Sequence, residues 1–159
     1  MLKKIAAVGV AAAALGWGLG AAPAQAAGMA YMQVRSVAYS LGECLDYRSD
    51  YGPYTTGCNG GAYQTWLMVD GLETVTEVRQ NVGDKLCLVA RNGMPTMRQC
   101  LADDPAALWK VHDIGAQDGY QLINNATKTC LVAGSGAIHH VTLNTCDGGR
   151  SRLWAPFYA

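Results

Sequence analysis

The sequence predicts an all-β domain in which three similar repeats close into an assembly of pseudo-threefold symmetry. Three observations support this fold class. The first cysteine of each of three pairs recurs at intervals of 43 residues, a tryptophan follows each pair in nearly the same phase, and no segment after residue 26 shows the period of a long amphipathic helix. Short β units of this kind can bury their apolar faces only against one another, which favours a single closed fold.

The first 26 residues have the order of a secretory signal peptide. Lys3 and Lys4 precede an apolar stretch that runs from Ile5 to about Ala22. The triplet Ala-Gln-Ala at 24–26 then has the small residues that are typical of a signal-peptide cleavage site. A retained membrane anchor is the alternative, but glycines interrupt the stretch and the triplet follows it directly. We therefore expect a signal peptide at 1–26, one secreted domain at 27–159, and no membrane span after cleavage.

The charge balance indicates neither nucleic acid nor an anionic membrane as a partner. The whole chain has 12 basic and 12 acidic residues. Loss of Lys3 and Lys4 with the signal peptide leaves the remaining domain mildly acidic.

Cysteine usage indicates disulfides rather than a metal site. All six cysteines follow residue 26, and an even number in an exported chain is typical of an oxidising compartment. The two nearest, Cys87 and Cys100, are 13 positions apart, which is not the spacing of a zinc knuckle. His139 and His140 are adjacent and would point to opposite faces of a strand. We expect no metal and no cofactor.

Each repeat has the same core pattern, which is Cys-Leu, a turn with Gly or Ser, a second Cys, and a Trp eight or nine residues later. The repeats cover about 38–76, 77–119 and 120–159. The patterns run from Cys44-Leu45 to Cys58 and Trp66, from Cys87-Leu88 to Cys100 and Trp109, and from Cys130-Leu131 to Cys146 and Trp154. A repeat that folds as a unit would bond its own two cysteines. This phasing predicts the disulfides Cys44–Cys58, Cys87–Cys100 and Cys130–Cys146, and it predicts that Trp66, Trp109 and Trp154 lie in the core.

Short segments rich in β-branched or aromatic residues are the predicted strands. They include 63–69, 74–78, 85–90 and 141–145, each bounded by Gly, Asn or Asp. A period near 43 also fits propeller blades and two-helix solenoid repeats. A propeller needs at least four blades, and a solenoid of that kind needs helices that this sequence does not indicate.

The first repeat carries a family resemblance. The segment from Cys58 to Trp66, which contains Asn59 and Gln64-Thr65-Trp66, resembles the Cys…Asn-Gln-x-Trp signature of ricin-type lectin repeats. Cys44-Leu45-Asp46 resembles the Cys-Leu-Asp start of the same repeats. The resemblance covers about 38–157. It implies a β-trefoil of about twelve short strands, with the tryptophans of the Gln-x-Trp motifs in its core.

The resemblance also implies a sugar site in the first repeat. In this family a working repeat holds one sugar with the Asp of Cys-Leu-Asp, an aromatic ring and an Asn-Gln pair, since directional polar groups read hydroxyls and a flat ring covers the apolar face of a pyranose. Carried over, Asp46 is the acceptor and Gln64 supports the pocket. Tyr63 stands where the family has its Asn. Tyr54, or alternatively Tyr51, replaces the stacking ring.

The second and third repeats depart from the family pattern. Val89 and Ala107 replace the Asp and the Gln in the second repeat, and Val132 and Arg152 replace them in the third. By the family pattern both repeats have lost their sugar sites. At most one site is therefore expected.

These features favour a binding module over an enzyme. The sequence contains neither a nucleophile elbow nor a phosphate-binding loop. We expect a secreted carbohydrate-binding module for a galactose-like or another glycan. The alternative is a degenerate trefoil that binds a protein, as an inhibitor or as the companion of a toxin or enzyme. Asp46 and Gln64 favour the sugar, whereas Tyr63 and the two altered repeats favour the protein partner.

Overall fold

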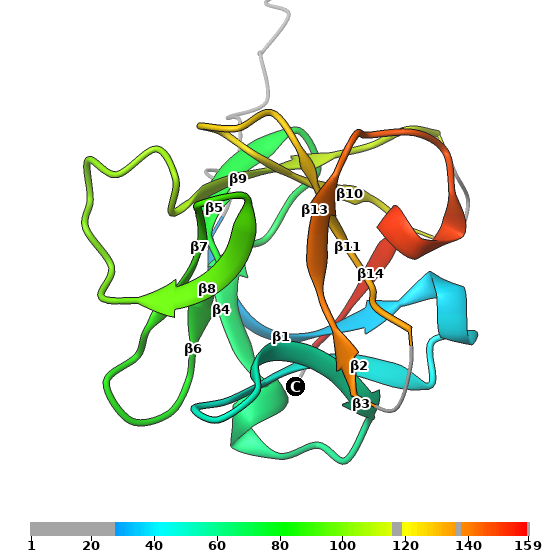
Figure 1. Ribbon diagram of the computed structural model, residues 1–159, viewed down its shortest axis with the longest axis horizontal. Helices are drawn as coiled ribbons and strands as arrows, with labels where there is room; N and C mark the ends of the chain where they lie inside the picture. The colour runs from blue at the N-terminus through cyan, green and yellow to red at the C-terminus, as the bar shows by residue number, and fades with distance from the viewer. Residues whose placement is uncertain (1–27, 116–118, 136–137, 159) are drawn as a thin grey trace, which may run out of the picture.

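The computed structural model describes residues 28–115, 119–135 and 138–158, so the predicted signal peptide lies outside the described residues. The described part of the chain forms fourteen strands and three single-turn 3-10 helices (Figure 1). In chain order they are β1 (Met29–Ser36), η1 (Val37–Tyr39), β2 (Glu43–Arg48), β3 (Gly52–Gly57), η2 (Ala62–Gln64), β4 (Trp66–Val69), β5 (Thr74–Glu77), β6 (Arg79–Gln80), β7 (Cys87–Arg91), β8 (Met94–Arg98), β9 (Leu108–His112), β10 (Gln121–Asn124), β11 (Cys130–Val132), β12 (His139–His140), β13 (Thr142–Asn144), η3 (Arg150–Arg152) and β14 (Trp154–Tyr158).

The predicted all-β fold of three units is confirmed. The first unit contains β1 to β4, the second β5 to β9, and the third β10 to β14. About twelve strands were expected, and the difference has a local cause. Val78 interrupts the first strand of the second unit and Val141 interrupts the third strand of the third unit, so each of these strands is divided in two. Both valines are buried, and at each of them the chain passes from one sheet to the other.

The barrel is a closed ring of antiparallel neighbours. β1 pairs with β4, β4 with β6, β5 with β9, and β9 with β10. A bridge between Tyr120 and Trp154 joins β10 to β14, and β14 returns to β1. The first and last strands therefore lie side by side, blue beside red in Figure 1. Closure protects the strand edges from further pairing.

The remaining strands form one antiparallel pair in each unit. These pairs are β2 with β3, β7 with β8, and β11 with β13. In addition, β12 of the third unit pairs with β3 of the first. This contact places the third unit directly beside the first unit's hairpin.

The three tryptophans explain why the Cys-Leu and Trp patterns recur together. Trp66, Trp109 and Trp154 are completely buried. Each indole Nε1 donates a hydrogen bond to the backbone carbonyl of the leucine after the unit's first cysteine, which are Leu45, Leu88 and Leu131, over 2.9, 2.8 and 3.0 Å. The leucine side chains are buried in the same core. The core thus has an apolar surface and a satisfied indole donor in every unit.

The predicted disulfides are confirmed as Cys44–Cys58, Cys87–Cys100 and Cys130–Cys146. The unit boundaries differ from the repeat pattern, because β1 begins at Met29, ahead of the expected start near 38. This strand contains none of the cysteines or tryptophans by which the repeat is recognised. The predicted strand at 63–69 is also too long at its start, since Tyr63 and Gln64 belong to η2 and the strand begins at Trp66.

Candidate functional site

Asp46 lies near the end of β2, directly opposite Tyr54 of β3. Its side chain is only 5% exposed. The carboxylate is held on both oxygens, because the backbone N–H of Tyr47 donates to Oδ1 over 2.6 Å and the amide of Gln64 donates to Oδ2 over 3.0 Å. Each oxygen retains lone-pair capacity for another donor. Asp46 is therefore a hydrogen-bond acceptor of fixed orientation at the base of a surface cleft.

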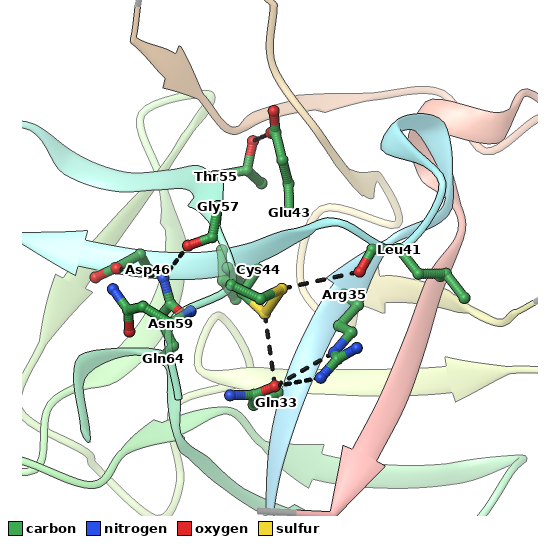
Figure 2. Close-up of a disulfide and its surroundings, with 12 residues drawn as sticks. Gln33, Arg35, Leu41, Glu43, Cys44, Asp46, Thr55, Gly57, Asn59 and Gln64 are labelled. Atoms are coloured by element: carbon green, nitrogen blue, oxygen red, sulfur yellow. Dashed lines mark hydrogen bonds between the residues drawn. A yellow bond between two sulfur atoms is a disulfide. The ribbon is translucent and has the colours of Figure 1, made fainter. Parts of the chain in front are cut away.

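Gln64 is completely buried and connects three parts of the first unit (Figure 2). Besides its bond to Asp46, its Nε2 donates to the carbonyl of Gly57 over 3.1 Å, and its Oε1 accepts from the backbone N–H of Asn59 over 2.8 Å. The 3-10 turn of η2 directs this side chain inward. Gln64 thus orients Asp46 and has no surface left with which to contact a ligand.

An open cleft of about 830 Å³ lies above this network. We call it the Asp46 cleft. Asp46, Tyr54, Asn59 and Tyr63 line its first-unit side, and Gln80 and Asp84 of the second unit line the other side. Of the four residues predicted to form the sugar site, Asp46, Tyr54 and Tyr63 border the cleft and Gln64 lies beneath it.

Asn59 is a cleft residue that the sequence prediction missed. Its Oδ1 accepts from the backbone N–H of Gly61 over 2.7 Å, while its Nδ2 forms no hydrogen bond within the described part of the chain. An amide donor is thus presented beside the Asp46 carboxylate (Figure 2). Its sequence signal is its place after Cys58 in Asn59-Gly60-Gly61, because the third unit has Asp147-Gly148-Gly149 at the same place.

Two tyrosines give the Asp46 cleft apolar surface. Tyr63 is 57% exposed, and Tyr54 is half-buried. Burial, followed by the nearby carboxylate of Asp46, raises the pKa of the Tyr54 phenol, which keeps it neutral. Tyr51, the alternative stacking residue, does not line this cleft. It lies against Tyr54 in an edge-on arrangement, with ring centroids 5.6 Å apart.

Carboxylates dominate the charge of the Asp46 cleft. Asp46, Asp50 and Asp84 line it together with one cation, Arg48. The Arg48 guanidinium is already paired with Asp50 over 2.8 Å. The cleft consequently disfavours an anionic ligand.

The second unit fills the equivalent corner with apolar groups. Val89 and Ala107, which occupy the places of Asp46 and Gln64, are completely buried. They pack with Cys87 and Cys100 in a small apolar cluster. This corner offers a ligand no buried carboxylate or amide.

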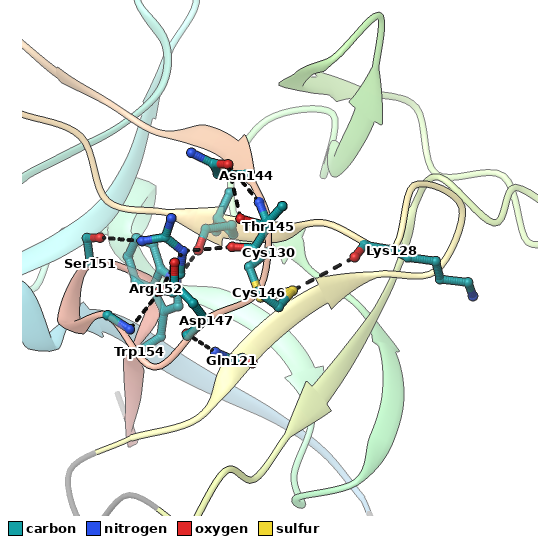
Figure 3. A network of polar contacts seen from close by, with 12 residues as sticks. Gln121, Lys128, Cys130, Asn144, Thr145, Cys146, Asp147, Ser151, Arg152 and Trp154 are labelled. Carbon is teal, nitrogen blue, oxygen red and sulfur yellow. Dashed lines mark hydrogen bonds and ion pairs between the residues drawn. A yellow bond between two sulfur atoms is a disulfide. The ribbon is translucent and has the colours of Figure 1, made fainter.

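The third unit fills the same corner with an ion pair (Figure 3). Arg152, at the place of Gln64, donates from Nε to the carbonyl of Thr145 over 2.8 Å, and the same nitrogen lies 3.2 Å from Asp147 Oδ1. Gly57 and Thr145 both precede the second cysteine of their unit, so Arg152 reproduces the contact of Gln64 with this carbonyl. The Gly149 N–H donates to Asp147 as the Gly61 N–H donates to Asn59. Arg152 thus closes this corner with protein groups.

No metal-binding arrangement with free ligands is found among the described residues. The one cluster of suitable residue types is Glu77 with Cys87 and Cys100, whose sulfurs form a disulfide. His139 contacts the carboxylate of Glu43 over 2.8 Å. Within the same residues, no helix has the length and apolar character needed to cross a membrane.

Residues 30–154 match the family model described as the ricin-type beta-trefoil lectin domain. No curated protein matches the chain. Among solved structures, the designed threefold-symmetric protein ThreeFoil has a TM-score of 0.67 and 16% identity, over 79% of this chain and 96% of that one. SeviL bound to asialo-GM1 saccharide has a TM-score of 0.64 and 14% identity, over 83% and 99%.

A lectin of Polyporus squamosus, bound to the epitope Neu5Aca2-6Galb1-4GlcNAc, has a TM-score of 0.66 and 16% identity, over 82% of this chain and 49% of that one. At these identities the likeness establishes the shared fold alone. The family match adds the repeat pattern to that evidence, across most of the described residues.

Proposed function

Because the chain belongs to the family of ricin-type β-trefoil lectin domains, we propose that it is a secreted carbohydrate-binding module with a single sugar site in the Asp46 cleft. The observation that carries this proposal is the orientation of Asp46 by Gln64 at the base of an open cleft. A fixed carboxylate accepts hydrogen bonds from sugar hydroxyls with defined direction. Holding it in advance reduces the entropy lost on binding.

The other cleft residues supply the remaining contacts. Asn59 offers an amide donor, in place of the family's ligand Asn that Tyr63 replaces here. Tyr63 and Tyr54 offer ring surfaces for the apolar face of a pyranose. Because three carboxylates and one paired arginine line the cleft, the preferred sugar is neutral, such as a galactose-like residue, rather than sialylated or sulfated.

Secretion is part of the same proposal. Three disulfides within one small domain favour an oxidising compartment. N-terminal sequencing of the protein recovered outside the cell is expected to begin at Ala27. A mature chain that begins at Met1 or remains in the membrane fraction would contradict secretion.

A glycan array with the purified protein and its Asp46→Ala and Asp46→Asn variants tests the site. Asp103→Asn is the matched control, because Asp103 is exposed and lines no described cleft. We expect the unaltered protein and the control to bind neutral glycans. Both Asp46 variants should fail to bind them. Melting curves verify that each variant is folded.

Equal binding by the Asp46 variants would reject this site. Binding of no glycan by any of the proteins would favour the second candidate, a trefoil that recognises a protein. The observation that favours this candidate is that Val89 with Ala107, and Arg152 with Asp147, occupy two of the three possible sugar corners with the protein's own groups.

A further inference from the structure

The third unit contributes an aromatic side chain beside the proposed sugar site. In the strand register, Tyr54 of β3 has Asp46 of β2 as its partner on one side and His140 of β12 on the other. Directly paired residues on neighbouring strands point to the same face of a sheet. Asp46, Tyr54 and His140 therefore form a row that begins in the first unit and ends in the third.

Tyr51 completes an aromatic surface at the end of this row. Its ring meets Tyr54 at 5.6 Å and His140 at 6.5 Å between centroids, edge-on to both. The guanidinium of Arg48 lies 4.1 Å from the centre of the Tyr51 ring and holds it from another side. The three rings are thus arranged by contacts among themselves and with Arg48.

A second cleft of about 320 Å³ adjoins the Asp46 cleft at this surface. Arg48 and Tyr54 line both clefts, so the two hollows meet over these side chains. The second cleft is also lined by Tyr51 of the first unit and by Ile138 and His139 of the third. His140 lines neither cleft and adjoins this surface through its contact with the Tyr51 ring. Both volumes fall within the range of roughly 300–1,000 Å³ that is typical of small-ligand sites.

We infer that the ligand is an oligosaccharide that spans both clefts, with one sugar at Asp46 and the next on the rings of Tyr54 and Tyr51, beside which His140 of the third unit lies. This inference rests on the proposed function, which it extends from a single sugar to a chain of at least two. Aromatic rings suit the apolar faces of successive pyranoses. The second and third units have lost their sugar sites, which weakens binding through several sites at once. A longer ligand with more contact area in one extended site compensates for that loss.

Calorimetric titration with galactose, lactose and the linear tetrasaccharide lacto-N-neotetraose tests the inference. We expect the unaltered protein to bind the tetrasaccharide at least tenfold more tightly than galactose. His140→Ala and Tyr51→Ala are expected to remove most of this gain and to leave galactose binding unchanged. His112→Ala on β9 is the control, because the His112 ring contacts Glu73 and lies in neither the ring cluster of Tyr51 nor the strand row of Tyr54.

The two levels of the proposal fail differently. If His140→Ala and Tyr51→Ala keep the full gain, or if the unaltered protein binds all three probes equally, the two-cleft ligand is wrong while the Asp46 site stands. If none of the probes binds, the inference falls for this galactose series, and the glycan array decides separately on the Asp46 site. Because His140 is exposed, its replacement is not expected to affect folding.

Discussion

The side-chain amide of Gln64 donates a hydrogen bond to the carboxylate of Asp46 over 3.0 Å, from 18 positions further along the chain. This pair is the difference between the first unit and the other two. The same amide also holds Gly57 and Asn59, so the proposed sugar site and the closure of the unit depend on one side chain. Function and stability are consequently linked at this corner.

Replacing Gln64 by leucine should destabilise the protein by about 3 kcal/mol. The substitution keeps the volume but leaves the buried Asp46 carboxylate and the Gly57 carbonyl without their donor. Urea unfolding followed by tryptophan fluorescence measures the change. Gln99→Leu is the control, because Gln99 is exposed, and it should shift stability by less than about 0.5 kcal/mol. Equal effects of the two variants would contradict the role assigned to Gln64.

Replacing any one of Trp66, Trp109 and Trp154 by phenylalanine should cost about 2–4 kcal/mol. Each change leaves a buried leucine carbonyl without its donor and a void beside the smaller ring. The three costs should agree closely, because the three environments repeat. Thermal or urea unfolding of the three single variants gives the comparison. A variant with unaltered stability would show that its indole contact contributes nothing.

The polar pair of the first unit can be introduced into the second. Val89→Asp alone should cost about 3–5 kcal/mol, because it buries a carboxylate in an apolar cluster. Adding Ala107→Gln should recover about 1–2 kcal/mol of that loss by supplying the donor that Gln64 supplies to Asp46. A double-mutant cycle from urea unfolding measures this coupling. Strict additivity would mean that the second unit cannot form the arrangement of the first.

Lowering the pH should remove the contribution of Glu73 to the stability of the folded protein. Lys110, the backbone N–H of Asp113 and His112 all bond to its carboxylate, and they lower the pKa of Glu73 from its ordinary 4.5 to about 2. A carboxyl whose pKa falls on folding stabilises the folded state above pH 4.5 and loses that effect as the pH falls towards 2. The melting temperature of the unaltered protein should exceed that of Glu73→Gln at pH 6.

This difference in melting temperature should close progressively between pH 4.5 and 2. Asp103→Asn serves as the control, because Asp103 is exposed and its side chain forms no hydrogen bond or ion pair with the described residues. Its melting temperature should follow that of the unaltered protein throughout. A difference between Glu73→Gln and the unaltered protein that persists at pH 2 would contradict this assignment.

The parts of the fold that sequence could predict are those repeated in each unit. The first cysteines recur at one interval, at Cys44, Cys87 and Cys130. A disulfide within each unit and a tryptophan at a fixed distance after it leave few other folds that the three repeats could form. The repeat pattern does not place β1 in the first unit, because this strand has no cysteine or tryptophan. The interruptions at Val78 and Val141 also have no counterpart in the other units, so the repeat contains no signal for them.

The candidate site was predicted only where it is local to one repeat. Asp46 and Gln64 follow from the motif, and the structure brings them into contact. Gln80 and Asp84 border the Asp46 cleft, and His140 pairs with Tyr54, because different units pack together, which one repeat cannot indicate. Asn59 could have been found, since Asn-Gly-Gly and Asp-Gly-Gly follow the second cysteines of the first and third units.

The pairing of β1 with β14 limits how far the protein can fold during its synthesis on the ribosome. Met32 and Tyr158 are partners, yet they come from opposite ends of the described chain. A growing chain can join β1 to β4, but the seam of the barrel stays open until the ribosome has released β14. Such distant pairings also slow folding. The barrel therefore remains open until β14 has left the ribosome, and an incompletely folded chain is the form that the proposed secretion requires.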